Sequence, residues 1–296
     1  MARAKVSTGM ELEYETFGSA EHPALLLVMG FSAQMIAWPE EFCAGLAARG
    51  YYVIRYDNRD CGLSTKLDGV EVDPMAVMAA ALSGQPLPPV PYTLSEMAAD
   101  GVALLDHLGV ERAHVAGASM GGMIVQMMAI EHPNRVRSMC SIMSMTGEPE
   151  FGAAAPEAMA ALLAPPPPDR DAYIASSDSW AVWASKKYLD RDEAQKRAAE
   201  SYDRSFYPEG SPRQLAAIFA TGSRAEGLRA LRVPTLVIHG RDDTLITPSG
   251  GTRTAELIDG AHLVMLADMG HDLPRPLFPI YFDVMSSHMR WADNYA

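Results

Sequence analysis

The sequence has little of several features that mark particular classes of protein. Its 296 residues include only three cysteines, and neither these nor the histidines show the spacing of a metal site. The longest apolar run, residues 24–29, is far too short to cross a bilayer and is typical of a buried strand. A glycine-rich fingerprint for binding phosphate is also missing. We therefore expect no metal, no cofactor and no insertion into a membrane.

Basic residues are the scarcer of the two charge types. Lys and Arg number 24 against 37 Asp and Glu, which gives a net charge of −13. Because nucleic acids and anionic membranes are bound by clusters of Lys and Arg, neither is an expected partner. The charge leaves a small-molecule substrate open, and it leaves open whether the protein is a monomer or a homodimer.

Cysteine usage and the first residues bear on the compartment. Cys43, Cys61 and Cys140 are odd in number, and we expect them to be free thiols in a reducing compartment. The residues after Met1 lead directly into strand-like sequence without an apolar signal region. Both observations predict a soluble, cytoplasmic protein. With 48% hydrophobic residues, a chain of this length can bury a sizeable core.

Apolar runs and helical periodicity alternate along most of the chain. Residues 5–17 alternate around Gly9 and predict an antiparallel hairpin at a sheet edge. Further strands are expected at residues 24–29, 51–56, 111–117, 136–143, 233–239 and 262–266. Helices are expected at residues 34–48, 94–108, 119–131, 249–258 and 276–290. This alternation predicts an α/β fold, in which a mostly parallel, twisted sheet is flanked by helices.

Two segments interrupt the alternation. Residues 83–91 contain too many prolines for a helix or an inner strand, whereas Thr93 and Glu96 have the spacing of a helix cap. From residue 145 to 222, Ala-rich stretches, a run of prolines and charged helical segments replace the strands. We interpret residues 1–144 and 223–296 as an α/β core and residues 145–222 as a mostly helical cap. The aromatic residues of the cap could line a pocket but are more often packing residues: Trp180, Trp183, Tyr188, Tyr202, Phe206, Tyr207 and Phe219.

The stretch Gly117-Ala118-Ser119-Met120-Gly121 has the form G-x-S-x-G and lies between an expected strand and an expected helix. Small residues on either side allow the sharp turn on which a serine hydroxyl projects from a sheet. Ser119 is therefore the candidate nucleophile.

A serine nucleophile needs an adjacent base, usually a histidine that a carboxylate orients. Sites in open parallel sheets form outside the carboxyl ends of the strands, so these partners are expected just after strands. The segment after the last expected strand offers His271, and the segment after the strand before it offers Asp242 and Asp243. Among the other histidines only His239, at a strand end, competes with His271. The loop chemistry alone leaves the choice between the two aspartates open.

Acyl transfer also requires N–H donors for the oxyanion that forms on the substrate. Where a G-x-S-x-G serine joins a strand to a helix, one donor belongs to the residue after the serine and the other to the loop after an early strand. These residues are Met120 and Phe31, the latter in the Met29-Gly30-Phe31 loop.

The chain resembles the α/β-hydrolase fold family over nearly its whole length outside residues 145–222. The segments that carry the resemblance are Val28-Met29-Gly30-Phe31, Tyr56-Asp57-Asn58-Arg59-Asp60-Cys61-Gly62-Leu63-Ser64, Gly117-Ala118-Ser119-Met120-Gly121-Gly122, His239-Gly240-Arg241-Asp242-Asp243 and Gly270-His271. Within the family, the Asp-x-Arg-Asp-x-Gly form and the Met-Gly loop are most similar to aclacinomycin methylesterases and related bacterial carboxylesterases.

The resemblance implies further assignments. The acid of the family is usually the third residue after the glycine of the His-Gly loop, which selects Asp243, and a helical cap is common where residues 145–222 fall. Two positions depart from the family pattern. Met29 replaces a frequent histidine, which leaves the backbone donor intact. Asp60 replaces a frequent glycine near the site, and we expect it to alter substrate preference. A serine in place of a nucleophilic aspartate argues against haloalkane dehalogenases and epoxide hydrolases.

The expected function is that of a cofactor-free carboxylic ester hydrolase, which acts on a small-molecule ester through an acyl-enzyme. Ser119, His271 and Asp243 are its expected triad, and Phe31 and Met120 its expected oxyanion donors. Perhydrolase or haloperoxidase activity and hydrolysis of C–C bonds, lactones or thioesters share these motifs and stay open. A ligand receptor on the same fold would be expected to have a damaged triad. The acyl and alcohol specificity and the substrate-contacting residues do not follow from the sequence.

Overall fold

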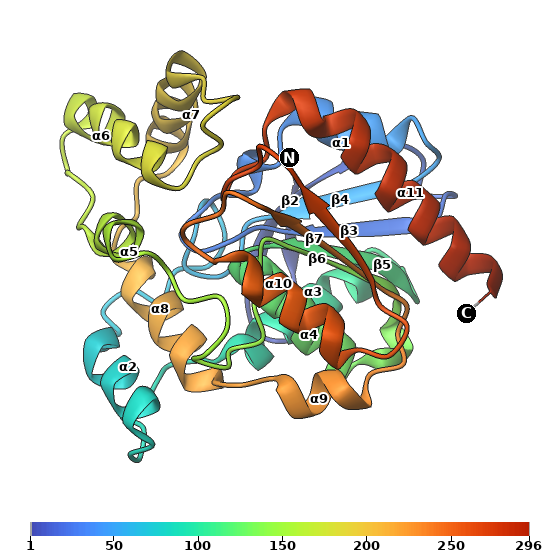
Figure 1. Ribbon diagram of the computed structural model, residues 1–296, viewed down its shortest axis with the longest axis horizontal. Helices are drawn as coiled ribbons and strands as arrows, with labels where there is room; N and C mark the ends of the chain where they lie inside the picture. The colour runs from blue at the N-terminus through green and yellow to red at the C-terminus, as the bar shows by residue number, and fades with distance from the viewer. Residues whose placement is uncertain (1, 296) are drawn as a thin grey trace.

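Eight strands form one sheet in the computed structural model of the chain, which describes residues 2–295 (Figure 1). The strands lie in the order β1-β2-β4-β3-β5-β6-β7-β8. Their bounds are β1 (Ala2–Lys5), β2 (Glu11–Phe17), β3 (Ala24–Val28), β4 (Tyr52–Tyr56), β5 (Ala113–Ala118), β6 (Val136–Ile142), β7 (Thr235–Gly240) and β8 (His262–Leu266). The β1–β2 pair is antiparallel, as the hairpin pattern predicted. The β2–β4 pair is also antiparallel, and the remaining pairs are parallel.

Helices cover both faces of the sheet (Figure 1). One face carries α1 (Glu40–Ala47) and α11 (Phe278–Tyr295), and the other carries α3 (Leu94–His107), α4 (Met120–Glu131) and α10 (Pro248–Leu257). Strand β3 shows why its sequence is a continuous apolar run. Leu25 and Leu27 point into one core and Leu26 and Val28 into the other, so every residue of the strand is buried. The predicted fold class, a mostly parallel sheet flanked by helices, is confirmed.

The expected helix at residues 34–48 is interrupted. A single 3₁₀ turn at Met35–Ala37 comes first, and α1 begins only at Glu40. Pro39 and Trp38 between them are both extended. A proline lacks the N–H that a helix interior requires, and it disfavours the helical conformation of the residue before it. Our predicted start of this helix was therefore wrong.

One helix of the long connection between β4 and α3 was not predicted. Helix α2 (Pro74–Ser83) begins at an Asp73 cap, whose carboxylate accepts the N–H groups of Met75 and Ala76, and ends at Gly84. Asp-Pro is typical of the start of a helix and Gly of its end, so the sequence does contain signals for α2. We predicted neither helix nor inner strand for residues 83–91; this holds for residues 85–91, whereas Ser83 is the last residue of α2. As predicted, Thr93 and Glu96 cap α3 in a capping box.

Between β6 and β7 the described structure contains helices and no strand. The helices of residues 145–222 are α5 (Pro156–Leu163), α6 (Arg170–Ser176), the 3₁₀ helix Ser177–Val182, α7 (Arg191–Arg204) and α8 (Gly210–Thr221). Helices α5, α6 and α7 lie beyond the sheet, whereas α8 packs against α2 and α3 (Figure 1). Helix α9 (Ala225–Ala230) then leads back to β7. The division into core and cap at residues 144 and 223 stays our interpretation.

The described residues add two observations on the expected class of protein. Within residues 2–295, no helix is long and apolar enough to span a membrane. Cys43, Cys61 and Cys140 are buried free thiols. Burial raises the pKa of Cys43 to about 12, so this thiol stays protonated and unreactive near neutral pH.

Candidate active site

Ser119 lies in the turn between β5 and α4. Its φ of 57° is in the left-handed region, which is unfavourable for a residue other than glycine. The Ser119 N–H donates to Ile142 O at 2.9 Å, and Ser144 Oγ donates to Ser119 O at 2.8 Å. Both backbone polar groups of the strained residue are therefore hydrogen-bonded. A Cβ on Gly121 would lie 2.1 Å from Val28 O, which explains the need for glycine after the serine. The surroundings thus fix a turn that presents the hydroxyl.

His271 and Asp243 meet Ser119 at the carboxyl ends of the strands. His271 Nε2 lies 2.9 Å from Ser119 Oγ, and His271 Nδ1 lies 2.7 Å from Asp243 Oδ2. His271 follows β8 and Asp243 follows β7, as their places in the sequence predicted. Because a carboxylate only accepts hydrogen bonds, Nδ1 carries the proton of the neutral ring and Nε2 is free to accept the serine proton.

Asp243 is held as an anion. Its Oδ1 accepts the backbone N–H groups of Leu245 and Ile246, each at 2.9 Å. Burial opposes its ionisation, but the adjacent His271 and hydrogen bonds from His239 and His271 outweigh burial and lower the pKa of Asp243 to about 2. Asp242 is exposed, and its N–H donates to Met269 O at 3.0 Å. Of the two aspartates left open by the loop chemistry, only Asp243 lies beside His271.

His239, the competing histidine, contacts the loop that carries Asp243. Its Nε2 is 2.8 Å from Ile246 O and 3.5 Å from Asp243 Oδ2, and its side chain is fully buried. A carbonyl oxygen only accepts hydrogen bonds, so Nε2 carries the proton here. His239 therefore braces the loop that carries Asp243 and does not approach the serine.

The loop after β3 lies directly against the serine. A Cβ on Gly30 would be 3.0 Å from Ser119 Cβ. Ala33 N–H donates to Gly30 O at 3.3 Å, which makes residues 30–33 a tight turn with Phe31 in its second position. Met120 is the first residue of α4, and the Ser119 side chain does not cap this helix. Backbone N–H groups at a helix start have no acceptor within the helix, which leaves Met120 N–H available.

Residues of the 145–222 segment, which we call the insertion, hold the loops that carry His271 and Asp243. Trp183 O accepts the His271 N–H at 2.7 Å, and Thr244 Oγ1 donates to Val182 O at 2.8 Å. Ser185 N–H donates to Asp272 Oδ2 at 3.0 Å. A Cβ on Gly270 would lie 2.3 Å from Trp183 O, so the Gly-His pair of the motif leaves space for this segment. The sequence reading missed these contacts, most of which involve backbone atoms.

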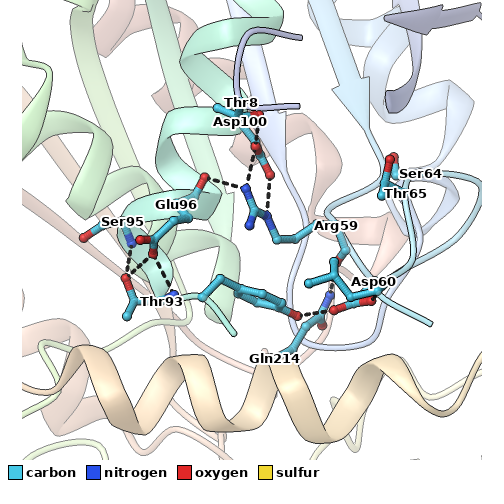
Figure 2. Close-up of polar contacts among 12 residues, drawn as sticks. Thr8, Arg59, Asp60, Ser64, Thr65, Thr93, Ser95, Glu96, Asp100 and Gln214 are labelled. Atoms are coloured by element: carbon cyan, nitrogen blue, oxygen red, sulfur yellow. Dashed lines mark hydrogen bonds and ion pairs between the residues drawn. The ribbon is translucent and has the colours of Figure 1, made fainter. Parts of the chain in front are cut away.

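Two charged residues of the 57–62 motif, Arg59 and Asp60, form ion pairs with residues elsewhere in the chain. Asp60 accepts two hydrogen bonds from Arg213 of α8, at 2.9 and 2.8 Å, and one from the Tyr92 hydroxyl at 2.7 Å. Arg59 pairs with Asp100 of α3 at 2.7 and 2.8 Å, and Figure 2 shows the Arg59 side chain pointing toward Asp100. We expected Asp60 to alter substrate preference. That expectation stays a prediction; the carboxylate itself is engaged with Arg213 of the insertion.

Aromatic residues of the insertion pack on one another at its outer end. The ring centroids of Tyr202 and Phe206 are 4.7 Å apart, and Tyr173 lies 5.5 and 5.6 Å from these two rings. For Tyr202 and Phe206 the packing interpretation is therefore the better one. Among residues 2–295, no group of three or more His, Cys, Asp or Glu side chains is arranged to hold a metal ion.

Comparison with known proteins gives consistent matches. The family described as the alpha/beta hydrolase fold matches residues 23–274. Rhodomycin D methylesterase DauP of Streptomyces sp. (strain C5) is 28% identical over 94% of each chain. A putative carbamate hydrolase, RutD of Variovorax paradoxus (strain S110), is 29% identical over 88% of this chain and 90% of that protein.

Solved structures share the fold at lower identity. The enol-lactonase from Burkholderia xenovorans LB400 superposes with a TM-score of 0.74 at 24% identity, over 98% of this chain and all (100%) of the other. The meta-cleavage product hydrolase from Pseudomonas fluorescens IP01 has a TM-score of 0.78 at 20% identity, over 99% and 98% of the two chains.

Proposed function

Because the chain belongs to the α/β-hydrolase fold family, we propose that it is a serine carboxylesterase with Ser119, His271 and Asp243 as its catalytic triad. The observation that carries the proposal is the line of hydrogen bonds from Ser119 Oγ through the His271 ring to Asp243 Oδ2. The family and the relatives named as esterases make the chain a hydrolase, and they support an ester as its substrate.

In the first half of the reaction, Ser119 Oγ attacks the ester carbonyl carbon while His271 Nε2 takes the hydroxyl proton. The carbonyl oxygen becomes an oxyanion, to which Phe31 and Met120 donate their N–H groups. When the tetrahedral intermediate collapses, the bond to the alkoxy group breaks and His271 returns the proton to the leaving alcohol. Ser119 then carries the acyl group as an ester.

In the second half, water replaces the alcohol. His271 takes a proton from the water as it attacks the acyl carbon, and the same N–H groups stabilise the second oxyanion. Collapse of this intermediate releases the acid and returns the proton to Ser119. Asp243 holds the imidazole in the required tautomer throughout and stabilises the imidazolium that forms in each half.

The substrate proposed is a small carboxylic ester, and methyl esters are the first to test because two relatives are named methylesterases. A lactone is an internal ester that the same triad would open, so a lactone belongs in the substrate panel. An assay with hydrogen peroxide and a halide separates ester hydrolysis from a haloperoxidase reaction on the same triad.

The test is hydrolysis of a short p-nitrophenyl ester by the wild type and by Ser119→Ala. Loss of a triad serine lowers kcat by about 10⁴- to 10⁶-fold in known serine hydrolases, and we expect a loss of this size. A fluorophosphonate probe should label the wild type and not the variant. Equal rates for the two proteins would reject the proposal, and failure of the probe to label Ser119 would favour a ligand receptor.

A further inference from the structure

The turn that carries Phe31 contains a strained residue. Ser32 has a φ of 55°, in the left-handed region, and it occupies the third position of the turn closed by Gly30 and Ala33. A positive φ at this position usually requires glycine or asparagine. A serine stays there only when its surroundings hold it, because the conformation itself is unfavourable. What holds Ser32 therefore also sets the direction of the Phe31 N–H.

Two residues of α8 hold Ser32. The Ser32 N–H donates to Gln214 Oε1 at 2.8 Å, and Ser32 Oγ lies 2.6 Å from Ser211 Oγ. The other end of the turn is held from the core, where Asn58 Nδ2 donates to Met29 O at 2.9 Å. The peptide groups around Phe31 thus lie between one anchor in the core and one in the insertion.

Both the oxygen and the nitrogen of the Gln214 side-chain amide form hydrogen bonds that hold this residue in place. It is fully buried, and its Nε2 donates to Arg59 O at 2.8 Å while its Oε1 accepts from Ser32. The two partners fix the orientation of the amide, because Ser32 N–H can only donate and Arg59 O can only accept. Figure 2 shows Gln214 rising from its helix toward Arg59 and Asp60. Arg59 is in turn held by Asp100, so the amide connects the turn to a rigid ion pair.

We propose that Gln214 is a positioning residue for the oxyanion site, which it serves by holding Ser32 and thereby aiming the Phe31 N–H at the substrate oxygen. The inference rests on the proposed esterase function. Donors of an oxyanion site act only when they are already aimed at the place where charge develops. A donor misplaced by about 1 Å can cost about 100-fold in rate. Gln214 would therefore affect the chemical step more than substrate binding.

The main test compares wild type with Gln214→Met, which keeps the length of the side chain and removes both hydrogen bonds. We expect kcat to fall by about 10- to 100-fold with a change in KM below about 3-fold. Binding of a trifluoromethyl ketone, which forms a tetrahedral adduct on the serine, should weaken in parallel with kcat. Rates are expressed per folded molecule, measured by circular dichroism at the assay temperature.

A matched control removes another hydrogen bond between α8 and the core. Thr221 Oγ1 accepts the Leu94 N–H at 2.9 Å at the other end of the helix, so Thr221→Val weakens the docking of α8 without touching Ser32. We expect a lower melting temperature and an unchanged kcat for this variant. A fall in kcat equal to that of Gln214→Met would mean that docking of α8, and not the amide, matters.

Gln214→Glu gives a second, independent readout. A neutral carboxyl group can accept from Ser32 and donate to Arg59 O, whereas a carboxylate would face that carbonyl oxygen with no proton to share. The ratio of the kcat of this variant to that of wild type should therefore rise as pH falls. A ratio independent of pH, together with an unchanged kcat in Gln214→Met, would overturn the inference while leaving an esterase. Loss of Ser119-dependent hydrolysis in the wild type itself would instead reject the proposed function, and the inference with it.

Discussion

The insertion contains two regions that use the same kind of ion pair in different surroundings. We call residues 182–185 and α8 the inner region, which contacts α2, α3 and the loops of Asp243 and His271. We call α6 and α7 the outer region. Arg213 in α8 pairs with Asp60, and both side chains are at most 5% exposed. Arg170 in α6 pairs with Asp203 in α7 through slightly shorter bonds, but these side chains are 44% and 55% exposed. Similar geometry therefore does not mean similar energy, because water competes for the exposed Arg170–Asp203 pair and not for the buried Arg213–Asp60 pair.

The two regions also differ in what their contacts reach. The inner region touches each loop that carries a proposed catalytic group other than Ser119 and Met120. Val182 bonds to the loop of Asp243, Trp183 to His271 and Gln214 to the turn of Phe31. Exposed ion pairs of the outer region join parts of the insertion, as Arg191 does with Asp178. Helix α7 also reaches the core, where Arg204 pairs with Asp57 at 2.8 Å. We infer that the inner region belongs to the working site and that the exposed ion pairs of the outer region tolerate change.

The largest effect on stability is expected from Arg213→Met in the inner region. The substitution leaves the Asp60 carboxylate buried without its cation, which costs about 3–5 kcal/mol of unfolding free energy in comparable buried pairs. Urea unfolding measures the change. Removing both charges in Asp60→Gly with Arg213→Met should recover most of the loss, since glycine also suits the φ of 61° at position 60. A loss below about 1 kcal/mol for the single variant would place this pair with the exposed ones.

A smaller loss of unfolding free energy is expected when acid protonates Asp243. Its pKa lies at about 2 in the folded chain and near 3.8 without its partners. The unfolded state therefore binds more protons in this window, so stability is present above about pH 4 and is lost as pH falls toward 2. A shift of this size corresponds to about 2 kcal/mol, by about 1.4 kcal/mol per pH unit.

Asp243→Asn isolates this contribution from other carboxylates. The difference in unfolding free energy between wild type and variant should shrink as pH is lowered from 5 to 2, because the variant has no proton to gain. The variant should also lose about 10⁴-fold in kcat at neutral pH, as an amide favours the wrong imidazole tautomer. A difference that stays constant with pH would contradict the depressed pKa.

Gly270→Ala probes the contact between the inner region and His271. A new Cβ would lie 2.3 Å from Trp183 O and 2.5 Å from Ala184 C, both backbone atoms that cannot move separately. Overpacking of this kind costs about 1–3 kcal/mol, and we expect kcat to fall as the neighbouring His271 is displaced. In the control Gly260→Ala the Cβ meets no atom within 4 Å, so kcat should not change although its φ of 74° makes alanine unfavourable. Normal turnover by Gly270→Ala would show that His271 does not depend on this segment.

The parts of the molecule that could be predicted are those with a local signal. The all-buried run of β3 and the capping box at Thr93 are visible within a few residues, and the order of Ser119, Asp243 and His271 follows from loops after strands. The structure brings these three side chains within hydrogen-bonding distance, while their catalytic roles stay a prediction.

The parts that escaped prediction depend on segments far apart in the chain. Gln214 bonds to Ser32, 182 residues away, and Arg213 bonds to Asp60 at a separation of 153. Neither glutamine nor arginine in an amphipathic helix differs, in sequence, from a solvent-exposed residue. The Asp60 departure from the family pattern was visible, but its pairing with Arg213 required the position of α8.

The smallest effect is expected from Arg170→Met, the outer counterpart of Arg213→Met. The two bonds from Arg170 to Asp203 are 2.6 and 2.7 Å long, shorter than those of the buried pair, yet both side chains face water. Breaking an exposed pair returns each charge to solvent and frees two long side chains, so the gain and the loss nearly cancel. We expect the melting temperature to stay within about 2 °C of wild type, and ester hydrolysis to be unchanged. A thermal scan at low and high salt checks this. If Arg170→Met destabilised the chain as much as Arg213→Met, bond geometry and not burial would set the strength of these pairs, and the distinction between the inner and outer regions would fail.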